Sequence, residues 1–88
     1  MSDSHIFKIS FYDNEDNEIK LTPQLYGSVV NVVGLRSTIS YAGDPAGNSV
    51  DIGVELVSSG WTKSSLQTAM EQYPTIQGQY KVNVQDKE

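Results

Sequence analysis

The chain has 88 residues, of which 38% are hydrophobic and 19% charged. This composition excludes a disordered chain and predicts one folded domain, 1–88, with flexible ends at 1–4 and 86–88. The absence of cysteine excludes a disulfide scaffold, thiol catalysis and cysteine-based zinc sites, and the net charge of −5 with scattered basic residues argues against direct nucleic-acid binding.

The first half of the chain is predicted to form strands. Apolar and polar residues alternate over 6–12, the period of a half-buried strand. The polar segment 13–17 is rich in Asp and Asn, which favour turns, and 18–22 is predicted to return as the second strand of a hairpin. Pro23 is expected to end that strand because it cannot donate a hydrogen bond to a neighbouring strand.

The middle of the chain continues this pattern. The β-branched run 28–33 predicts a strand buried on both faces, and Gly34 predicts a bulge or bend before a further strand at 35–41. The loop 42–49 then leads into a strand over 50–57. Four residues of 35–41 are expected to share one face: Leu35, Ser37, Ile39 and Tyr41. No apolar run is long enough to span a membrane.

A single helix is predicted over 62–73, followed by a strand over 76–85. The helix has apolar residues at helical spacing: Leu66, Ala69, Met70 and Tyr73. Its start is assigned to either Thr62 or Ser64, because Ser64 and Gln67 have the spacing of a capping box. Pro74 is expected to stop the helix at Tyr73.

These elements predict an α+β fold with the order β-β-β-β-β-α-β. We expect a single, largely antiparallel sheet of five or six strands with the helix packed on one face. The two strands that flank the helix could lie parallel, joined by a right-handed crossover. A small barrel of the oligonucleotide/oligosaccharide-binding type is the alternative, although its helix normally lies between the third and fourth strands.

The sequence offers few candidate catalytic or metal-binding residues. The acidic turn from Asp13 to Glu18 fits a calcium loop poorly, because Glu18 stands where that loop needs glycine. Asp51 and Glu55 lie too far apart along a strand for an acid–base pair, and His5 has no triad signature around it. We therefore predict no catalytic residue, no metal and no cofactor.

The remaining signals predict contact with a protein. Trp61 lies just before the helix, where it either packs the helix end onto the sheet or anchors a partner. Polar side chains alternate along the last predicted strand, and four residues are candidates for partner contact: Gln77, Gln79, Lys81 and Asn83. This strand is also expected to be an edge open to another chain.

The hypothesis from sequence is therefore a small non-enzymatic interaction or accessory protein. A viral (phage) assembly component and an inhibitor of another protein are examples of this class, and self-association is included. The alternative is an acidic decoy that mimics nucleic acid and blocks a nucleic-acid-binding protein. The amino terminus has no signal-peptide pattern, which favours the cytoplasm, and no membrane contact is expected.

Overall fold

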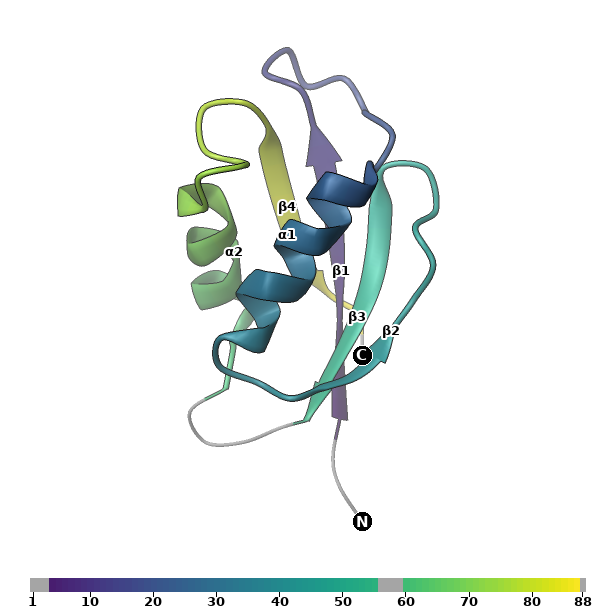
Figure 1. The fold of residues 1–88 in the computed structure, drawn as a ribbon, viewed down its shortest axis with the longest axis vertical. Coiled ribbons are helices and arrows are strands. Elements are labelled where there is room, and N and C mark those ends of the chain that lie inside the picture. Colours follow the sequence, from purple (N-terminus) through teal and green to yellow (C-terminus); the bar gives the residue numbers. More distant parts are fainter. Residues whose placement is uncertain (1–3, 56–59, 88) are drawn as a thin grey trace.

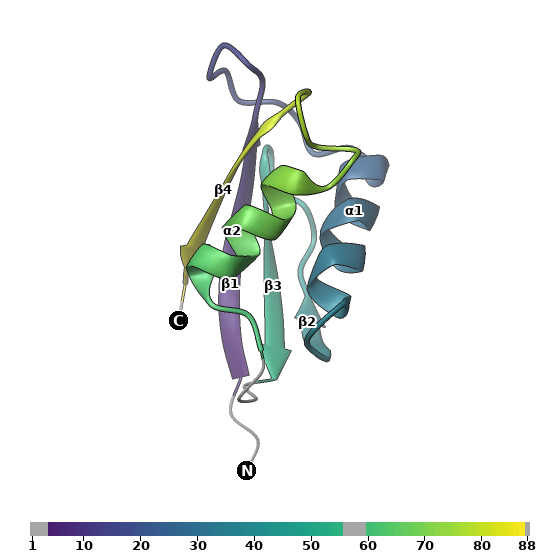
Figure 2. The ribbon, with the colours of Figure 1, turned by 90° about the vertical axis from the view of Figure 1, so that its left-hand side faces the viewer.

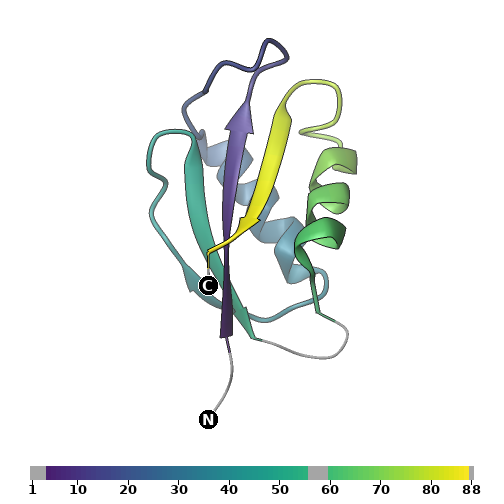
Figure 3. The same ribbon diagram turned by 180° about the vertical axis from the view of Figure 1, so that it is seen from behind.

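The computed structural model describes residues 4–55 and 60–87, which form a four-stranded sheet and two helices (Figure 1). In chain order the elements are β1 Ser4–Tyr12, α1 Pro23–Gly34, β2 Ile39–Ala42, β3 Ser49–Glu55, α2 Lys63–Gln72 and β4 Lys81–Asp86. The strands lie in the order β2-β3-β1-β4, and each neighbouring pair is antiparallel. Both helices cover the same face, and no helix of the described residues lies on the other face of the sheet (Figures 2 and 3).

The core lies between this covered face and the helices. Alternate residues of the strands point toward the helices and are buried: Phe7, Ile9 and Phe11 of β1, Val50, Ile52 and Val54 of β3, and Val82 and Val84 of β4. The helices contribute Leu25, Val29, Val32 and Val33 from α1 and Leu66 and Met70 from α2. The strand period of two and the helix period of 3.6 therefore meet in one apolar layer.

The strands on either side of α2 run parallel but are not neighbours. β3 and β4 are each antiparallel to β1, which lies between them. The β1-α1-β2 unit is split in the same way by β3. This β-α-β-β-α-β arrangement is the ferredoxin-like, or split β-α-β, topology. It occurs with many unrelated functions, so the fold leaves the function of this chain open.

The prediction of one helix and five or six strands is wrong, because residues 23–34 form α1 in place of a strand at 28–33. Thr22 caps this helix: its side-chain hydroxyl accepts a hydrogen bond from the backbone N–H of Leu25 at 3.2 Å. Pro23 occupies the first helical position, where its fixed φ is favourable and its missing N–H costs nothing. The buried face of α1 then repeats at helical spacing through Leu25, Val29 and Val32.

The predicted strand at 18–22 is also wrong. Only one isolated bridge, between Tyr12 and Glu18, continues the hairpin in the described part of the chain. Asp16 has φ +67°, and the chain then moves away from β1 to the loop between β2 and β3. There the backbone N–H of Leu21 donates to the carbonyl of Gly47 at 2.9 Å.

The last strand begins later than predicted. Residues 76–80 form a turn in which Gly78 has φ +76°, and β4 starts at Lys81. The backbone N–H of Gln79 donates to the carbonyl of Ile76 at 3.0 Å within this turn. Ile76 is buried in the core although it lies in this turn and not in a strand.

The strand predicted over 35–41 is shorter in the structure, because residues 35–38 follow the end of α1 and only Ile39–Ala42 form β2. Three other elements agree with the sequence. The strand predicted over 6–12 corresponds to β1, the helix over 62–73 to α2, and the strand over 50–57 to β3, although residues 56 and 57 lie outside the described part. Thr62, not Ser64, is the N-cap of α2, and its capping-box partner is Ser65. Among the described residues, neither helix has the length and apolar character needed to span a membrane.

Candidate interaction surface

The face of the sheet that neither helix covers is a candidate interaction surface. Its residues follow from the strand register: Tyr41 of β2, Ser49, Asp51, Gly53 and Glu55 of β3, Ile6, Lys8, Ser10 and Tyr12 of β1, and Lys81, Asn83 and Gln85 of β4. We call this set the open face. It is mixed in character, with aromatic, amide, hydroxyl and charged side chains together.

One end of the open face is apolar. Ile6 lies opposite Gly53 in the register, and Tyr41 lies opposite Gly53 on the other side. A Cβ atom added at Gly53 would lie 3.1 Å from the Cβ of Tyr41 and 3.6 Å from Cγ1 of Ile6. Gly53 therefore leaves room between Tyr41 on one side of β3 and Ile6 on the other, while the ring of Tyr41 extends toward Gly43, where an added Cβ would lie 3.3 Å from Cε2. Tyr41 remains 53% exposed, which leaves much of its ring available for contact.

A bulge in β2 sets the orientation of Tyr41. The register shifts between Ile39, which lies opposite Val54, and Tyr41, which lies opposite Gly53. This extra residue reverses the alternation after Ile39. Tyr41 therefore points to the open face, while Ile39 packs against the core, although the sequence pattern places them on one face.

Two charged residues of the open face, Asp51 and Lys81, are paired with charged residues beside it. Nζ of Lys87 lies 2.6 Å from a carboxylate oxygen of Asp51, and Nζ of Lys81 lies 2.8 Å from one of Asp16. Lys8 lies between β3 and β4 on this face and makes no ion pair with any residue that the structure describes. The net charge of −5 is thus not concentrated on the open face.

The structure separates the four predicted contact residues of the last strand. Lys81 and Asn83 lie in β4 and belong to the open face. Gln77 and Gln79 are exposed but lie in the turn before β4, so they do not continue the row of polar side chains. The predicted ribbon of alternating amides is therefore interrupted at Tyr80.

Trp61, the fifth predicted contact residue, lies between the two helices. Its indole N–H donates to the backbone carbonyl of Val33 at the end of α1, at 2.8 Å, and its side chain is 9% exposed. The guanidinium of Arg36 lies 4.8 Å from the centre of its ring, a cation–π contact. Trp61 thus joins the end of α1 to the start of α2, and it presents little surface to a partner.

The residues considered for catalysis do not converge. His5 belongs to the helix-covered side of β1, where Nε2 lies 2.7 Å from a carboxylate oxygen of Asp86 and the ring contacts Phe7 edge-on. Asp51 lies on the open face and is bonded to Lys87. His5 and Asp51 are therefore on opposite faces of the sheet.

The carboxylate of Asp13 stabilises the acidic turn through hydrogen bonds to its backbone. Asp13 accepts hydrogen bonds from the backbone N–H of Asn17 at 2.9 Å and of Glu15 at 2.8 Å. These hydrogen bonds lower the pKa of the Asp13 carboxyl below its ordinary value. The bond from Asn17 has the larger effect and the bond from Glu15 the smaller. Within the described residues, no group of three potential metal-binding side chains occurs.

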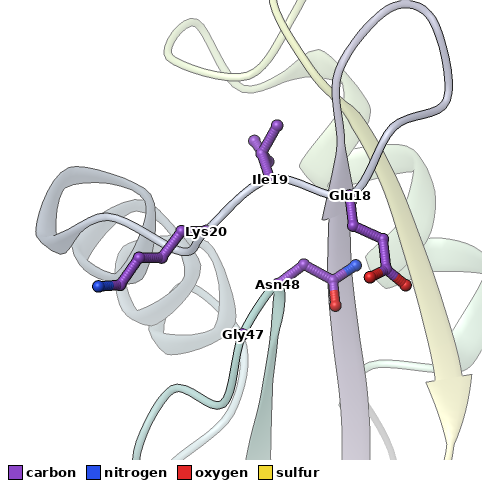
Figure 4. A pocket seen from close by; sticks show the side chains of 5 residues that line it. All are labelled: Glu18, Ile19, Lys20, Gly47 and Asn48. Carbon is purple, nitrogen blue, oxygen red and sulfur yellow. The ribbon is translucent and has the colours of Figure 1, made fainter.

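A shallow hollow of about 320 Å³ lies beside the tip of the sheet (Figure 4). It is lined by Glu18, Ile19, Lys20, Gly47 and Asn48. The side chains of Glu18 and Asn48 point toward one another, whereas Lys20 points away. The amide of Asn48 donates to the backbone carbonyl of Phe11 at 3.1 Å, so it is engaged in holding the loop. The hollow lacks the converging polar groups of a ligand site.

Comparison with protein-family models, with curated proteins and with solved structures finds no significant match for this chain. The candidate surface therefore rests on geometry alone. Sequence reasoning misses the side to which Tyr41 points, because the bulge reverses it. It also misses the hydrogen bonds from the Gln67 side chain of α2 to the backbone of Val82 and Val84, since the sequence suggests only a capping role for Gln67.

Proposed function

We propose that this chain is a non-enzymatic protein-binding domain that contacts a protein partner through the open face. The observation that carries this proposal is the sheet face that neither helix covers (Figure 3), with Ile6 and the exposed Tyr41 on either side of Gly53. An exposed aromatic residue beside a small apolar patch, surrounded by polar side chains, is typical of the centre and rim of an interface.

The chemistry of the face favours a protein over a nucleic acid. Four-stranded sheets that bind single-stranded RNA stack bases on aromatic side chains of the sheet. Here the middle positions of β1 and β3 on the open face are Lys8, Ser10, Asp51 and Gly53. The aromatic residues of the face, Tyr12 and Tyr41, lie toward its ends. Ion pairing of Lys81 and Lys87 also reduces their availability to phosphate.

Affinity purification from the native source tests the proposal, with Tyr41→Asp compared with the wild type. We expect the wild type to recover a stoichiometric partner, and Tyr41→Asp to lose at least tenfold in affinity because a charge is placed in the apolar part of the interface. Gln72→Ala, an exposed position on α2, is the matched control and should bind normally. Recovery of the same partner by Tyr41→Asp, or a strictly monomeric protein without any partner, would contradict the proposal.

The acidic decoy is the alternative. Its carboxylates would have to be spaced along one surface and free to meet a basic partner. The densest acidic group lies in the turn from Asp13 to Glu18, and Asp16 and Asp51 are paired with lysines. A decoy should lose affinity steeply as salt rises, whereas binding through Tyr41 and Ile6 should change little.

A further inference from the structure

The β4 edge of the sheet is partly occupied by a side chain. Among the described strands, β4 pairs only with β1, and the carbonyl of Val82 and the N–H of Val84 point away from β1. The side-chain amide of Gln67 lies against this edge. Its Nε2 donates to the carbonyl of Val82 at 2.5 Å, and its Oε1 accepts from the backbone N–H of Val84 at 2.6 Å. One amide thus makes two hydrogen bonds of the kind that a neighbouring strand would make.

The position of this amide is fixed by its surroundings. Leu66 is completely buried on α2 and Met70 likewise, which sets the rotation of the helix against β4. Oε2 of Glu71, one turn after Gln67, accepts a second hydrogen bond from Nε2 at 2.9 Å. Figures 1 and 2 show α2 running beside β4. The amide is therefore held with its donor toward Val82 and its acceptor toward Val84.

We propose that Gln67 closes the β4 edge against a second copy of this chain. Unpaired strand edges are templates for pairing with another strand, and proteins block them with specific side chains. β4 is suited to pair with itself: in the antiparallel register centred on Asn83, Val82 lies opposite Val84 of the other copy and Lys81 lies opposite Gln85. No like charges face one another in this register, so removal of Gln67 leaves an edge that matches its own copy.

Sedimentation equilibrium of Gln67→Ala tests this inference, with the wild type and Gln72→Ala as references. We expect Gln67→Ala to raise the self-association constant at least tenfold over both references. Amide hydrogen exchange at Val84 should also become about tenfold faster in the monomer, because its hydrogen-bond acceptor is gone. Adding Asn83→Asp to Gln67→Ala should abolish the new association, since two carboxylates would then lie opposite one another.

Two results would overturn the inference: unchanged mass and Val84 exchange in Gln67→Ala, or new association that persists after Asn83→Asp. If Gln67→Ala does not fold, Gln67→Glu decides the question, because it keeps the acceptor for Val84 but cannot donate to Val82 when ionised. Gln67→Glu should then show a higher self-association constant than the wild type, with Val84 still protected from exchange, and a monomer identical to the wild type would overturn the inference. These outcomes are independent of Tyr41, so they are separable from the proposed binding function.

Discussion

The side chains on the two faces of the sheet differ in their surroundings. On the covered face, Phe7, Ile9 and Phe11 are buried by two helices, and each contributes to one apolar core. On the open face, the intervening residues Lys8 and Ser10 contact other side chains of the sheet or solvent. One strand therefore carries much of the core on its odd-numbered residues, while its even-numbered residues range from the exposed Lys8 to Ser10, which is 7% exposed.

Adjacent substitutions in β1 should show this difference most strongly. Ile9→Ala removes a fully buried side chain and leaves a cavity, which should lower the free energy of unfolding by about 2–5 kcal/mol. Lys8→Ala changes an exposed residue next to it and should stay within about 0.5 kcal/mol of the wild type. Urea unfolding measures both. Similar losses for the two variants would show that the faces are not energetically distinct.

Alanine substitutions at two glycines should change the free energy of unfolding in opposite directions. Gly53→Ala places a Cβ 3.1 Å from Tyr41 Cβ and 3.3 Å from Ser40 Oγ, and should destabilise the protein by about 1–3 kcal/mol because β2 must shift. Gly27→Ala meets no atom within 4 Å and lies inside α1, so it should stabilise by about 0.5–1 kcal/mol. Thermal unfolding of the pair measures both signs. Equal stability of the two variants would mean that the open face at Gly53 is not closely packed.

Trp61→Phe should lower the stability by a smaller amount. The variant shows whether Trp61 stabilises the fold or contacts a partner. The change removes the indole hydrogen bond to Val33, which should cost about 1 kcal/mol, since that carbonyl still accepts from the backbone N–H of Ser37. Partner affinity should be unchanged, because the side chain is largely buried. A loss of affinity with unchanged stability would instead make Trp61 a contact residue.

Asp13→Asn should have the smallest effect, visible mainly as a change in pH dependence. Since the pKa of Asp13 is lower in the folded than in the unfolded protein, its ionised form contributes stability above the unfolded pKa. That contribution is lost as the pH falls below the ordinary value of 3.8 and through the lowered folded pKa. Chemical unfolding between pH 5 and pH 2, spanning about the range in which such carboxyls titrate, should show a shallower acid decline in Asp13→Asn than in the wild type. Identical slopes would show that the turn does not depend on this charge.

The elements with one clear period could be predicted from the sequence. The alternation over 6–12 and 50–57 and the helical spacing of Leu66 and Met70 all correspond to β1, β3 and α2. Each of these segments has only one period that fits its apolar residues, so local pattern and tertiary packing agree. Lys81 and Asn83 were placed on a polar strand face for the same reason.

The errors arose where one signal has two physical meanings. Pro23 can end a strand or begin a helix, and the capping hydroxyl of Thr22 decides between them only when the following residues are seen as a helix. The valines of α1 fit a buried strand by composition, although Val29 and Val32 also fit a helical face. Gly78 turned part of the last predicted strand into a turn, and the bulge reversed Tyr41. Such choices depend on contacts distant in sequence, which no single segment records.

The central position of β1 has a consequence for how this chain acquires its structure. β1 is synthesised before β2, β3 and β4, yet its Ser10 lies opposite Asn83 in β4. The sheet therefore cannot be completed until synthesis has passed Asp86, and until then one side of β1 is exposed. Such distant pairing slows folding, so the interval between synthesis and closure is when nascent chains are most open to capture by a chaperone.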